Sequence, residues 1–460
     1  MLPVAVGLLV LVLYTWWSLL QWHRWEVPSW DLGIFTQLAK SYAAGYGPVV
    51  HIKGHGANLL GDHFHPILVL LAPVYAVFPS ALTLLVVQDV LVAVSAWAVT
   101  RFAVRSLGAG PGAALGLAYG LSFGLQAAVS VQFHEVAFAL PLLALALGYL
   151  VEGRWTASAL WAAPVVFVKE DLGVTVAVLG LVLAWRAHRE AGGSRRPVAV
   201  GLGLAAWGAT WSALAVTVVL PALSADGRFA YADRLDVGAA LADPVAALVG
   251  LVVPGQKALT WLTLLLTGAV VVLRSPLALV ALPTLLWRML SPNHGYWGTG
   301  WHYSAVLMPI VLLALLDAVL RLRQGSRPGV RAAARAAPVL ALGVALLLLP
   351  ARPLAGLADP DAYRPDPRAA AKAATVEAVP AGASVATDLS LMNRLVPVAQ
   401  VHWVGTRGDP APEYVVVDRL GAAWGGNPPQ DVAAWARQAY GADYTVVRDE
   451  AHLVVARRGG

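Results

Sequence analysis

Residues 81–100 read ALTLLVVQDVLVAVSAWAVT, in which Asp89 is the single charged side chain. A helix needs about 20 predominantly apolar residues to cross the hydrocarbon core of a bilayer, so this stretch predicts a transmembrane helix. Comparable apolar stretches occupy residues 2–20, 112–130, 136–151, 155–168, 172–185, 198–221, 258–273, 276–290, 303–320 and 336–350. The sequence therefore predicts an all-α polytopic membrane bundle of about eleven transmembrane helices.

The composition excludes several other classes of protein. Of the 460 residues, 58% are hydrophobic and 13% are charged, against roughly 25% charged in ordinary soluble proteins. A soluble enzyme and a disordered chain are therefore excluded. The chain has no cysteine, which excludes disulfides, thiolate catalysis and cysteine-bound metals. The net charge of +6 is spread over many loops, so we expect no nucleic-acid partner.

The distribution of arginine predicts which side of the membrane each loop occupies, because short cytoplasmic loops carry an excess of Lys and Arg. The most arginine-rich segments are residues 186–196 and 321–335, and both lie inside if the N-terminus is inside. The apolar run 2–20 lacks the basic start and the cleavage site of a signal peptide, so we expect a retained first helix.

This topology divides the chain into two predicted domains. Residues 1–351 form the transmembrane domain, with a long outer loop at 21–65 and an interfacial helix at 66–78. Residues 352–460 form a small soluble α/β domain outside the membrane. Its strands are expected near residues 384–387, 414–418, 444–448 and 452–457, and its helices near 368–378 and 430–440.

The first outer loop contains the leading candidate for a catalytic residue. Asp31 follows Trp22, Trp25 and Trp30, aromatic side chains that prefer the membrane interface. Partial burial there would raise the pKa of the Asp31 carboxyl and suit it to act as a general base. The alternative is that Asp31 only caps the helix expected over residues 32–43.

Histidines gather on the same predicted side. His63 and His65 precede Pro66, which favours an extended chain in which both side chains point the same way. They could bind one phosphate or one metal ion, and His134 and Glu135 could complete the set. Two histidines are a weak metal signal, so hydrogen bonding to an anionic substrate is favoured over a divalent cation. The sequence identifies no cofactor.

Charged residues at later outer junctions complete the candidate site. Lys169, Glu170 and Asp171 are three consecutive charges between apolar stretches, which is costly near lipid unless they face water, each other or a ligand. They are either the tip of a tight turn or a site in which Lys169 holds a phosphate. Arg288 and the aromatic segment that ends in His302 and Tyr303 offer a second surface for an anion or a sugar.

A set of motifs resembles a known family. In chain order they are Trp30-Asp31-Leu-Gly-Ile-Phe-Thr-Gln37, His63-Phe-His-Pro66, Leu71-Ala-Pro-Val-Tyr75, Phe133-His-Glu135, Lys169-Glu-Asp171 and His302-Tyr303. As a set, they resemble a bacterial family of polytopic membrane proteins known as a domain of unknown function, over about residues 15–320. That family is in turn similar to the GT-C class of membrane glycosyltransferases.

The resemblance implies transfer of a sugar from a polyprenyl-phosphate carrier to an acceptor on the outer face of the bacterial cytoplasmic membrane. Membrane lipid and the lipid-linked sugar are the implied partners, and the oligomeric state is not indicated. The chain lacks an Asp-x-Asp pair at Asp31, which disfavours a metal-dependent mechanism of that kind. By position, the resemblance matches Asp31 to the acidic residue of the first outer loop and His63 to the start of the interfacial helix. From the residues themselves we predict that Asp31, His63 and Glu135 are catalytic and that the following bind substrate: Gln37, His65, His134, Lys169, Glu170, Asp171, Arg288, His302 and Tyr303.

Two other functions remain open on the sequence alone. A transporter or lipid flippase would carry polar residues through its spans and paired broken helices in two halves. A non-catalytic envelope scaffold would use the outer domain to recruit other proteins. The concentration of reactive residues at one predicted membrane face favours the transferase.

Overall fold

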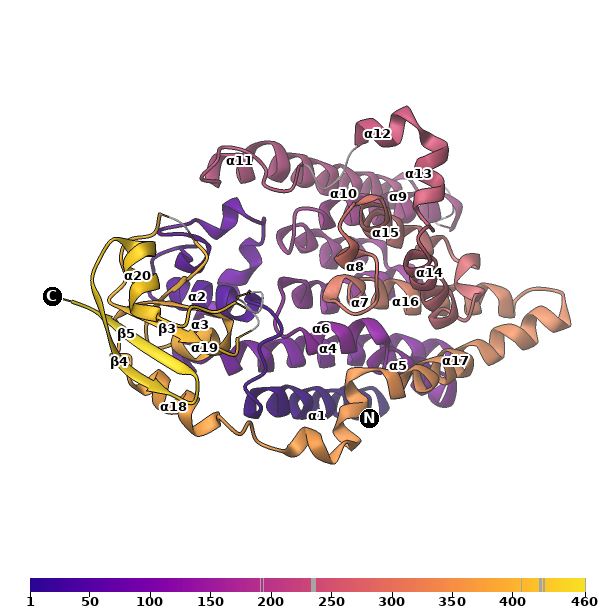
Figure 1. The fold of residues 1–460 in the computed structure, drawn as a ribbon. Coiled ribbons are helices and arrows are strands. Elements are labelled where there is room, and N and C mark those ends of the chain that lie inside the picture. The colour runs from indigo at the N-terminus through magenta and orange to yellow at the C-terminus, as the bar shows by residue number, and fades with distance from the viewer. Residues whose placement is uncertain are drawn as a thin grey trace.

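The computed structural model describes residues 1–190, 192, 194–232, 237–406, 408–421, 424 and 427–459. Within them most of the first 350 residues are helical (Figure 1). The helices are α1 (Leu2–His23), α2 (Asp31–Ala43), α3 (Leu71–Val77), α4 (Ala81–Leu107), α5 (Ala109–Gly120), α6 (Phe123–Ser130), α7 (Ala139–Val151), α8 (Trp155–Ala162), α9 (Leu172–Glu190), α10 (Arg195–Leu214), α11 (Leu220–Leu223), α12 (Val237–Ala242), α13 (Pro244–Gly250), α14 (Gly255–Thr267), α15 (Leu282–Leu290), α16 (Leu307–Arg323) and α17 (Pro328–Leu348).

Seven helical segments within these described residues are long and apolar enough to cross a membrane. They are Leu2–His23, Ala81–Leu107, Ala109–Ser130, Leu172–Glu190, Arg195–Leu223, His302–Arg323 and Pro328–Ala351. Together, α13 and α14 are also long and apolar enough to cross a membrane, but the two helices are bent by 64° relative to each other. The predicted spans 136–151, 155–168 and 276–290 fold as shorter apolar helices. Pro164 is the second residue of the 3₁₀ segment Ala163–Phe167, and Pro276 is the first residue of the 3₁₀ segment Pro276–Ala281. Proline lacks the N–H that the interior of a regular helix needs.

The packing of α9 against α10 depends on glycine. A Cβ added at Gly208 of α10 would lie 2.4 Å from the Gly173 carbonyl oxygen, and one added at Gly180 of α9 would lie 2.4 Å from the Ala205 backbone nitrogen. Small residues allow helix backbones to approach this closely in membranes, where van der Waals packing drives association. The two helices are therefore held in a fixed register, which positions the residues just before α9.

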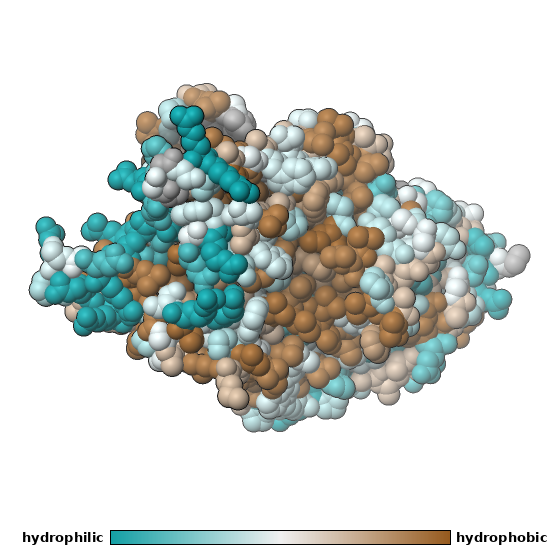
Figure 2. Space-filling model, turned by 180° about the vertical axis from the view of Figure 1, so that it is seen from behind, coloured by the Kyte–Doolittle hydropathy of each residue, from teal (hydrophilic) through white to brown (hydrophobic). Residues whose placement is uncertain are grey.

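The surface of the helical part is apolar around its middle. Figure 2 shows a broad hydrophobic area across this face of the molecule, with hydrophilic surface toward its two ends. Large apolar side chains are exposed on several helices of the bundle, among them Leu8, Val12, Leu181, Leu202 and Leu262. Exposure of this kind is expected where the surrounding medium is lipid. The protein is thus an integral membrane protein.

The C-terminal part contains a five-stranded sheet in the order β2-β1-β3-β5-β4 (Figure 1). Strands β1, β2 and β3 pair in parallel, whereas β5 pairs antiparallel with both β3 and β4. Its elements are α18 (Ala369–Glu377), β1 (Ser384–Thr387), α19 (Leu389–Leu395), β2 (Gln400–Trp403), β3 (Tyr414–Asp418), α20 (Val432–Tyr440), β4 (Tyr444–Glu450) and β5 (Leu453–Arg458).

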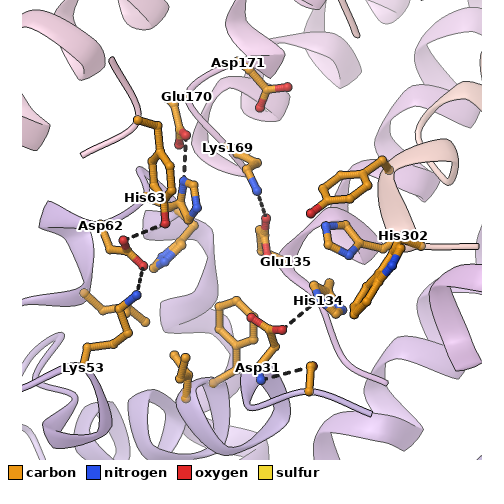
Figure 3. Close-up of a pocket in the computed structure, with 18 of the residues that line it drawn as sticks. Asp31, Lys53, Asp62, His63, His134, Glu135, Lys169, Glu170, Asp171 and His302 are labelled. Atoms are coloured by element: carbon orange, nitrogen blue, oxygen red, sulfur yellow. Dashed lines mark hydrogen bonds and ion pairs between the residues drawn. The ribbon is translucent and has the colours of Figure 1, made fainter. Parts of the chain in front are cut away.

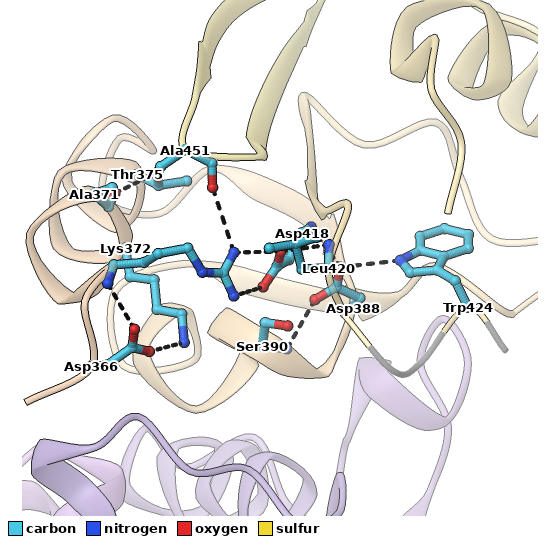
Figure 4. A network of polar contacts seen from close by, with 11 residues as sticks. Asp366, Ala371, Lys372, Thr375, Asp388, Ser390, Asp418, Leu420, Trp424 and Ala451 are labelled. Carbon is cyan, nitrogen blue, oxygen red and sulfur yellow. Dashed lines mark hydrogen bonds and ion pairs between the residues drawn. The ribbon is translucent and has the colours of Figure 1, made fainter. Parts of the chain in front are cut away.

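A polar network fixes the carboxyl ends of the central strands (Figure 4). Arg368, just before α18, pairs with both carboxylate oxygens of Asp418 at 2.8 and 3.0 Å. The backbone N–H of Asp418 donates to Asp388 Oδ2 at 2.7 Å. Because Asp388 follows β1 and Asp418 ends β3, the network joins the two strands and the helix in front of them.

The sheet docks on the segment that follows α1. Within residues 21–65 the chain forms α2 and two 3₁₀ turns, η1 (His51–Lys53) and η2 (Leu59–Gly61). On α2, Gln37 Nε2 donates to the Val401 carbonyl at 2.9 Å, and Lys40 Nζ donates to the carbonyls of Val396 and Ala399 at 2.8 and 2.9 Å. These bonds tie α2 to the chain around β2. Residues 66–77 form a 3₁₀ turn that continues into α3, where an interfacial helix was predicted.

Candidate active site

A cavity of about 820 Å³ lies where the helical bundle meets the C-terminal sheet. Leu389 of α19 and Trp403 of β2 contribute to its wall from the sheet side, and Val174 of α9 from the bundle. Ten of the side chains predicted from sequence line it together: Asp31, His63, His65, His134, Glu135, Lys169, Glu170, Asp171, His302 and Tyr303. Residues from distant parts of the chain thus meet in one hollow, as the sequence hypothesis requires.

Asp31 is held at the start of α2 with its carboxylate toward the cavity. Its backbone N–H donates to Ser29 Oγ at 3.3 Å, and α2 has no side-chain cap. The carboxylate instead pairs with His134, whose Nε2 lies 3.5 Å from Asp31 Oδ2. The Asp31 side chain is 28% exposed, so it is open to the cavity as well as paired with His134.

The chain before η4 (Glu135–Phe138) positions His134. Its backbone N–H donates to Gln88 Oε1 at 3.1 Å, and its ring Nδ1 donates to the Gln132 carbonyl at 3.1 Å. Gln132 itself has φ 71°, a backbone conformation that side-chain-bearing residues rarely adopt and that is found where the surroundings enforce it. With Nδ1 occupied, Nε2 is the nitrogen that meets Asp31.

The two groups shift each other's pKa in opposite directions. Burial alone would raise the pKa of the Asp31 carboxyl, but the hydrogen bond and the charge of His134 lower it to about 2. Burial would lower the pKa of the His134 imidazole, but Asp31 raises it above its usual value. The sequence prediction of a raised Asp31 pKa is therefore wrong, because it considered desolvation without the partner.

Two further pairs connect the turn before α9 to the opposite wall (Figure 3). Lys169 Nζ donates to Glu135 Oε1 at 2.7 Å. His63 Nδ1 lies 2.7 Å from Glu170 Oε1, and the backbone N–H of Phe64 donates to Glu170 Oε2 at 3.0 Å. In Figure 3 Glu135 lies between Lys169 and Asp31, which point into the cavity from opposite sides.

The three consecutive charges differ in protonation. Burial would lower the pKa of the Lys169 ammonium, but Glu135 and its other acidic neighbours hold it well above the usual value. Burial would raise the pKa of Glu170, but the charge and hydrogen bond of His63 lower it to about 2. For Asp171, burial prevails and raises the pKa to about 6, although Lys169 opposes it. Lys169 is therefore a partly buried ammonium next to several carboxylates.

Aromatic rings close one side of this polar cluster. The ring of His302 stacks on that of His134, with centroids 3.8 Å apart, and Tyr303 lies against His302 at 4.2 Å. His65 is buried and meets Phe35 edge to face at 5.9 Å. These contacts hold the imidazoles of His134, His302 and His65 in place at the cavity wall.

Gln37 and Arg288, two predicted substrate-binding residues, do not line the cavity. Gln37 joins α2 to β2 through its amide nitrogen, and its Oε1 accepts the Ile52 backbone N–H at 2.9 Å. Arg288 donates to the carbonyls of Tyr296 and Gly298 at 2.8 and 2.9 Å. Both buried side chains satisfy backbone groups of neighbouring loops, so the structure gives them a supporting position in place of the predicted contact with substrate.

Sequence reasoning missed a group of residues on the far side of the cavity. Lys53 Nζ lies 3.1 Å from Asp62 Oδ2, and Tyr231 Oη donates to Asp62 Oδ1 at 2.9 Å. The ring of Tyr231 also stacks on His63 with centroids 4.4 Å apart. Asp62 precedes His63 and could have been found by extending that motif. No sequence signal connects Tyr231 to it.

Comparisons with known proteins agree with this architecture. No curated protein matches the chain. Among solved structures, ArnT from Cupriavidus metallidurans bound to undecaprenyl phosphate is similar at 12% sequence identity, with a TM-score of 0.55 over 99% of this chain and 97% of that one. This likeness establishes an ArnT-like fold. A family model described as "Predicted membrane protein (DUF2079)" matches residues 24–455, which include both the cavity and the sheet, and the chain therefore belongs to that family.

Proposed function

We propose that the protein is a GT-C membrane glycosyltransferase that moves a sugar from a polyprenyl-phosphate carrier to an acceptor hydroxyl. The observation that carries the proposal is the meeting of the Asp31 carboxylate and the Lys169 ammonium in one cavity of about 820 Å³. A base and a phosphate-binding cation are the two groups that this transfer needs. The ArnT-like fold supports it, since ArnT itself binds undecaprenyl phosphate in its crystal structure.

Lys169 is the proposed partner of the donor phosphate. An ammonium carries three N–H groups, and one of these donates to Glu135, so further donors remain for an anion. The Lys169 side chain is 16% exposed, and in this partly buried position a positive charge stabilises developing negative charge more strongly than in water. Val174, Val216 and Phe229 line the same cavity and provide an apolar side for the lipid.

Asp31 is the proposed acceptor of the hydroxyl proton. The acceptor oxygen bonds to the anomeric carbon, the bond from that carbon to the phosphate oxygen breaks, and the hydroxyl proton passes to Asp31. Because the pKa of Asp31 is about 2, the carboxylate is ionised at any physiological pH and orients the hydroxyl before it accepts the proton. His63, His65, His134, Glu135, Glu170, Asp171, His302 and Tyr303 complete the proposed pocket.

The proposed location of the cavity is the outer face of the bacterial cytoplasmic membrane. Lys169 to Asp171 precede α9, whereas Glu190 ends it and pairs with Arg321 near the end of α16 at 3.0 Å. Arg186 and Arg189 near the end of α9, and Arg321 and Arg323 near the end of α16, therefore lie at the opposite end of these helices from the cavity. The positive-inside rule assigns that end to the cytoplasm, with the N-terminus inside and the sheet outside.

The proposal is tested by transfer assays in membrane vesicles from bacteria that express the chain, since these supply the native acceptor. Undecaprenyl-phosphate sugars labelled in the sugar are added as a panel, and label that leaves the lipid extract for the envelope fraction is counted. Asp31→Asn is expected to lower the rate by about 10²- to 10⁴-fold, which is typical for loss of a general base.

The matched control is Asp226→Asn, which removes one carboxylate at an exposed position outside the cavity and is expected to keep the full rate. Lys169→Gln is expected to weaken binding of undecaprenyl phosphate. Full transfer by Asp31→Asn, or no transfer from any donor in the panel, would contradict the proposal.

A further inference from the structure

Three histidines outside the cavity converge at the junction between the first loop and the sheet. They are His51 in η1, His55 just after it and His402 in β2, and one ring nitrogen of each lies within 4.8 Å of those of the other two. The rings of His51 and His402 have centroids 5.2 Å apart, and those of His55 and His402 stack at 5.9 Å. Among the described residues, this is the single group of three such side chains close enough to hold a metal ion.

Asp409 accepts hydrogen bonds from two of these histidines. Its Oδ2 accepts a hydrogen bond from His402 Nδ1 at 3.0 Å, and its Oδ1 accepts the backbone N–H of His55 at 2.8 Å. In His402 this leaves the lone pair of Nε2 free for a metal ion. In His51 the Nδ1 atom accepts the Gly56 N–H at 3.1 Å, and Nε2 meets the Gln400 amide nitrogen at 2.8 Å, a contact that a bound ion would replace. A carboxylate bound to the second nitrogen of a ligating histidine is a recurrent feature of metal sites, where it fixes the ring and its tautomer.

We propose that His51, His55 and His402 bind a Zn²⁺ ion that joins the first loop to the sheet. Imidazole nitrogens suit Zn²⁺ and related transition metals, whereas Mg²⁺ and Ca²⁺ prefer oxygen ligands. Three histidines leave the fourth tetrahedral position to water. His55 is exposed and His402 buried, so the ion can enter from solvent and reach a rigid strand.

Residues close to the proposed ligands in the chain line the cavity. Lys53 lies in the same 3₁₀ turn as His51, and Trp403 follows His402, and both Lys53 and Trp403 line the cavity. Trp403 also packs edge to face on Trp30 with centroids 5.8 Å apart, beside Asp31. A bound ion would therefore fix two parts of the cavity wall relative to each other. The inference does not rest on glycosyl transfer.

The test uses the full chain, purified in detergent through a tag without histidine and stripped with a chelator. Zn²⁺ alone is titrated by calorimetry, and the bound metal is counted by atomic emission. We expect one tightly bound equivalent in the unchanged protein and its loss in His55→Ala, the exposed ligand whose removal disturbs folding least. Asp409→Asn is expected to weaken the affinity by about 10- to 100-fold, as replacements behind a metal ligand do.

His188→Ala is the matched control, because His188 is exposed on α9 and far along that helix from the cavity, and we expect it to keep the full equivalent. Zn²⁺ should also raise the thermal unfolding midpoint of the unchanged protein and of His188→Ala but not that of His55→Ala. Absence of a bound equivalent in the unchanged protein overturns the proposal. Undiminished binding by His55→Ala also overturns it, since the ion would then reside on other histidines.

Discussion

At the scale of single residues, the pair formed by Asp31 and His134 makes stability depend on pH. Asp31 has a pKa lowered to about 2 and contributes stability above its unfolded value near 3.9, which is lost as the pH falls through about 2. His134 has a raised pKa and contributes stability below its unfolded value near 6.5, which is lost as the pH rises through the raised value. The pair is therefore fully effective between about pH 4 and 6.5.

The first prediction concerns this window. The unchanged protein should exceed Asp31→Asn in stability most between about pH 4 and 6.5, and the difference should shrink above that range as His134 loses its proton. Thermal unfolding in detergent over a pH series measures it, with Asp226→Asn as the control. A difference that grows steadily up to pH 9 would show that His134 is not the partner that matters.

The second prediction contrasts two neighbouring carboxyls. Burial raises the pKa of Asp171 to about 6, so its ionisation costs stability as the pH rises from about 4 to 6, and Asp171→Asn should be relatively more stable at pH 8 than at pH 4.5. The pKa of Glu170 is lowered to about 2, so its ionised form stabilises the fold at both pH values, and Glu170→Gln should be destabilised at pH 8 and at pH 4.5. Thermal unfolding midpoints of the two variants and of the unchanged protein, measured at pH 4.5 and pH 8, test both expectations. Changes of the same sign in both variants would count against the assigned environments.

Much of the site could be predicted from single residues, because polar and charged side chains that flank long apolar stretches stand out in the sequence. Asp31, His134 and Lys169 were found in this way and do line the cavity. Gln37 and Arg288 share that sequence context, but their hydrogen bonds go to backbone carbonyls. Sequence context does not distinguish a side chain that meets a ligand from one that satisfies a buried loop.

At the scale of elements, the close contact of α9 and α10 gives the third prediction. Gly208→Ala places a Cβ 2.4 Å from the Gly173 carbonyl oxygen, so the helices must separate, at a cost of about 1–3 kcal/mol. The shift also strains the bond from Ser212 Oγ to the Glu170 carbonyl, 2.5 Å long, and should therefore reduce transfer activity. Thermal unfolding and the vesicle assay measure the two effects.

Gly203→Ala is the matched control on the same helix. An added Cβ there meets nothing within 4 Å, and alanine favours a helix over glycine by about 1 kcal/mol. Gly203→Ala should therefore equal or exceed the unchanged protein in stability. Equal behaviour of the two variants would mean that helix propensity, and not the contact between backbones, governs this pair.

The long elements were predictable from the sequence, whereas the short ones were only partly so. The long apolar stretches became helices because burial in lipid dominates every other local preference. The four residues of β2 and the seven of α19 were missed, although β1, which also has four residues, was predicted. α19 depends on a cap, the Asp388 side chain that accepts the Ser390 N–H at 2.9 Å, and β2 depends on its pairing with β1.

At the scale of the whole molecule, the bundle and the sheet were both predictable, but the way they meet was not. Composition predicts a membrane part and a later soluble part. The cavity wall needs both, since Trp403 and Leu389 come from the C-terminal part and Asp31 from the first loop. Contacts between residues separated by more than 300 positions, such as Gln37 with Val401, depend on tertiary folding and leave no local signal.

The attachment of α2 to the sheet also has a mechanical consequence. Gln37 and Lys40 of α2 donate hydrogen bonds to backbone carbonyls around β2, and Asp31 is the first residue of the same helix. A rotation of the sheet would therefore also move α2. A molecule that bound the edge strand β4 and shifted the sheet would change the position of Asp31 without entering the cavity.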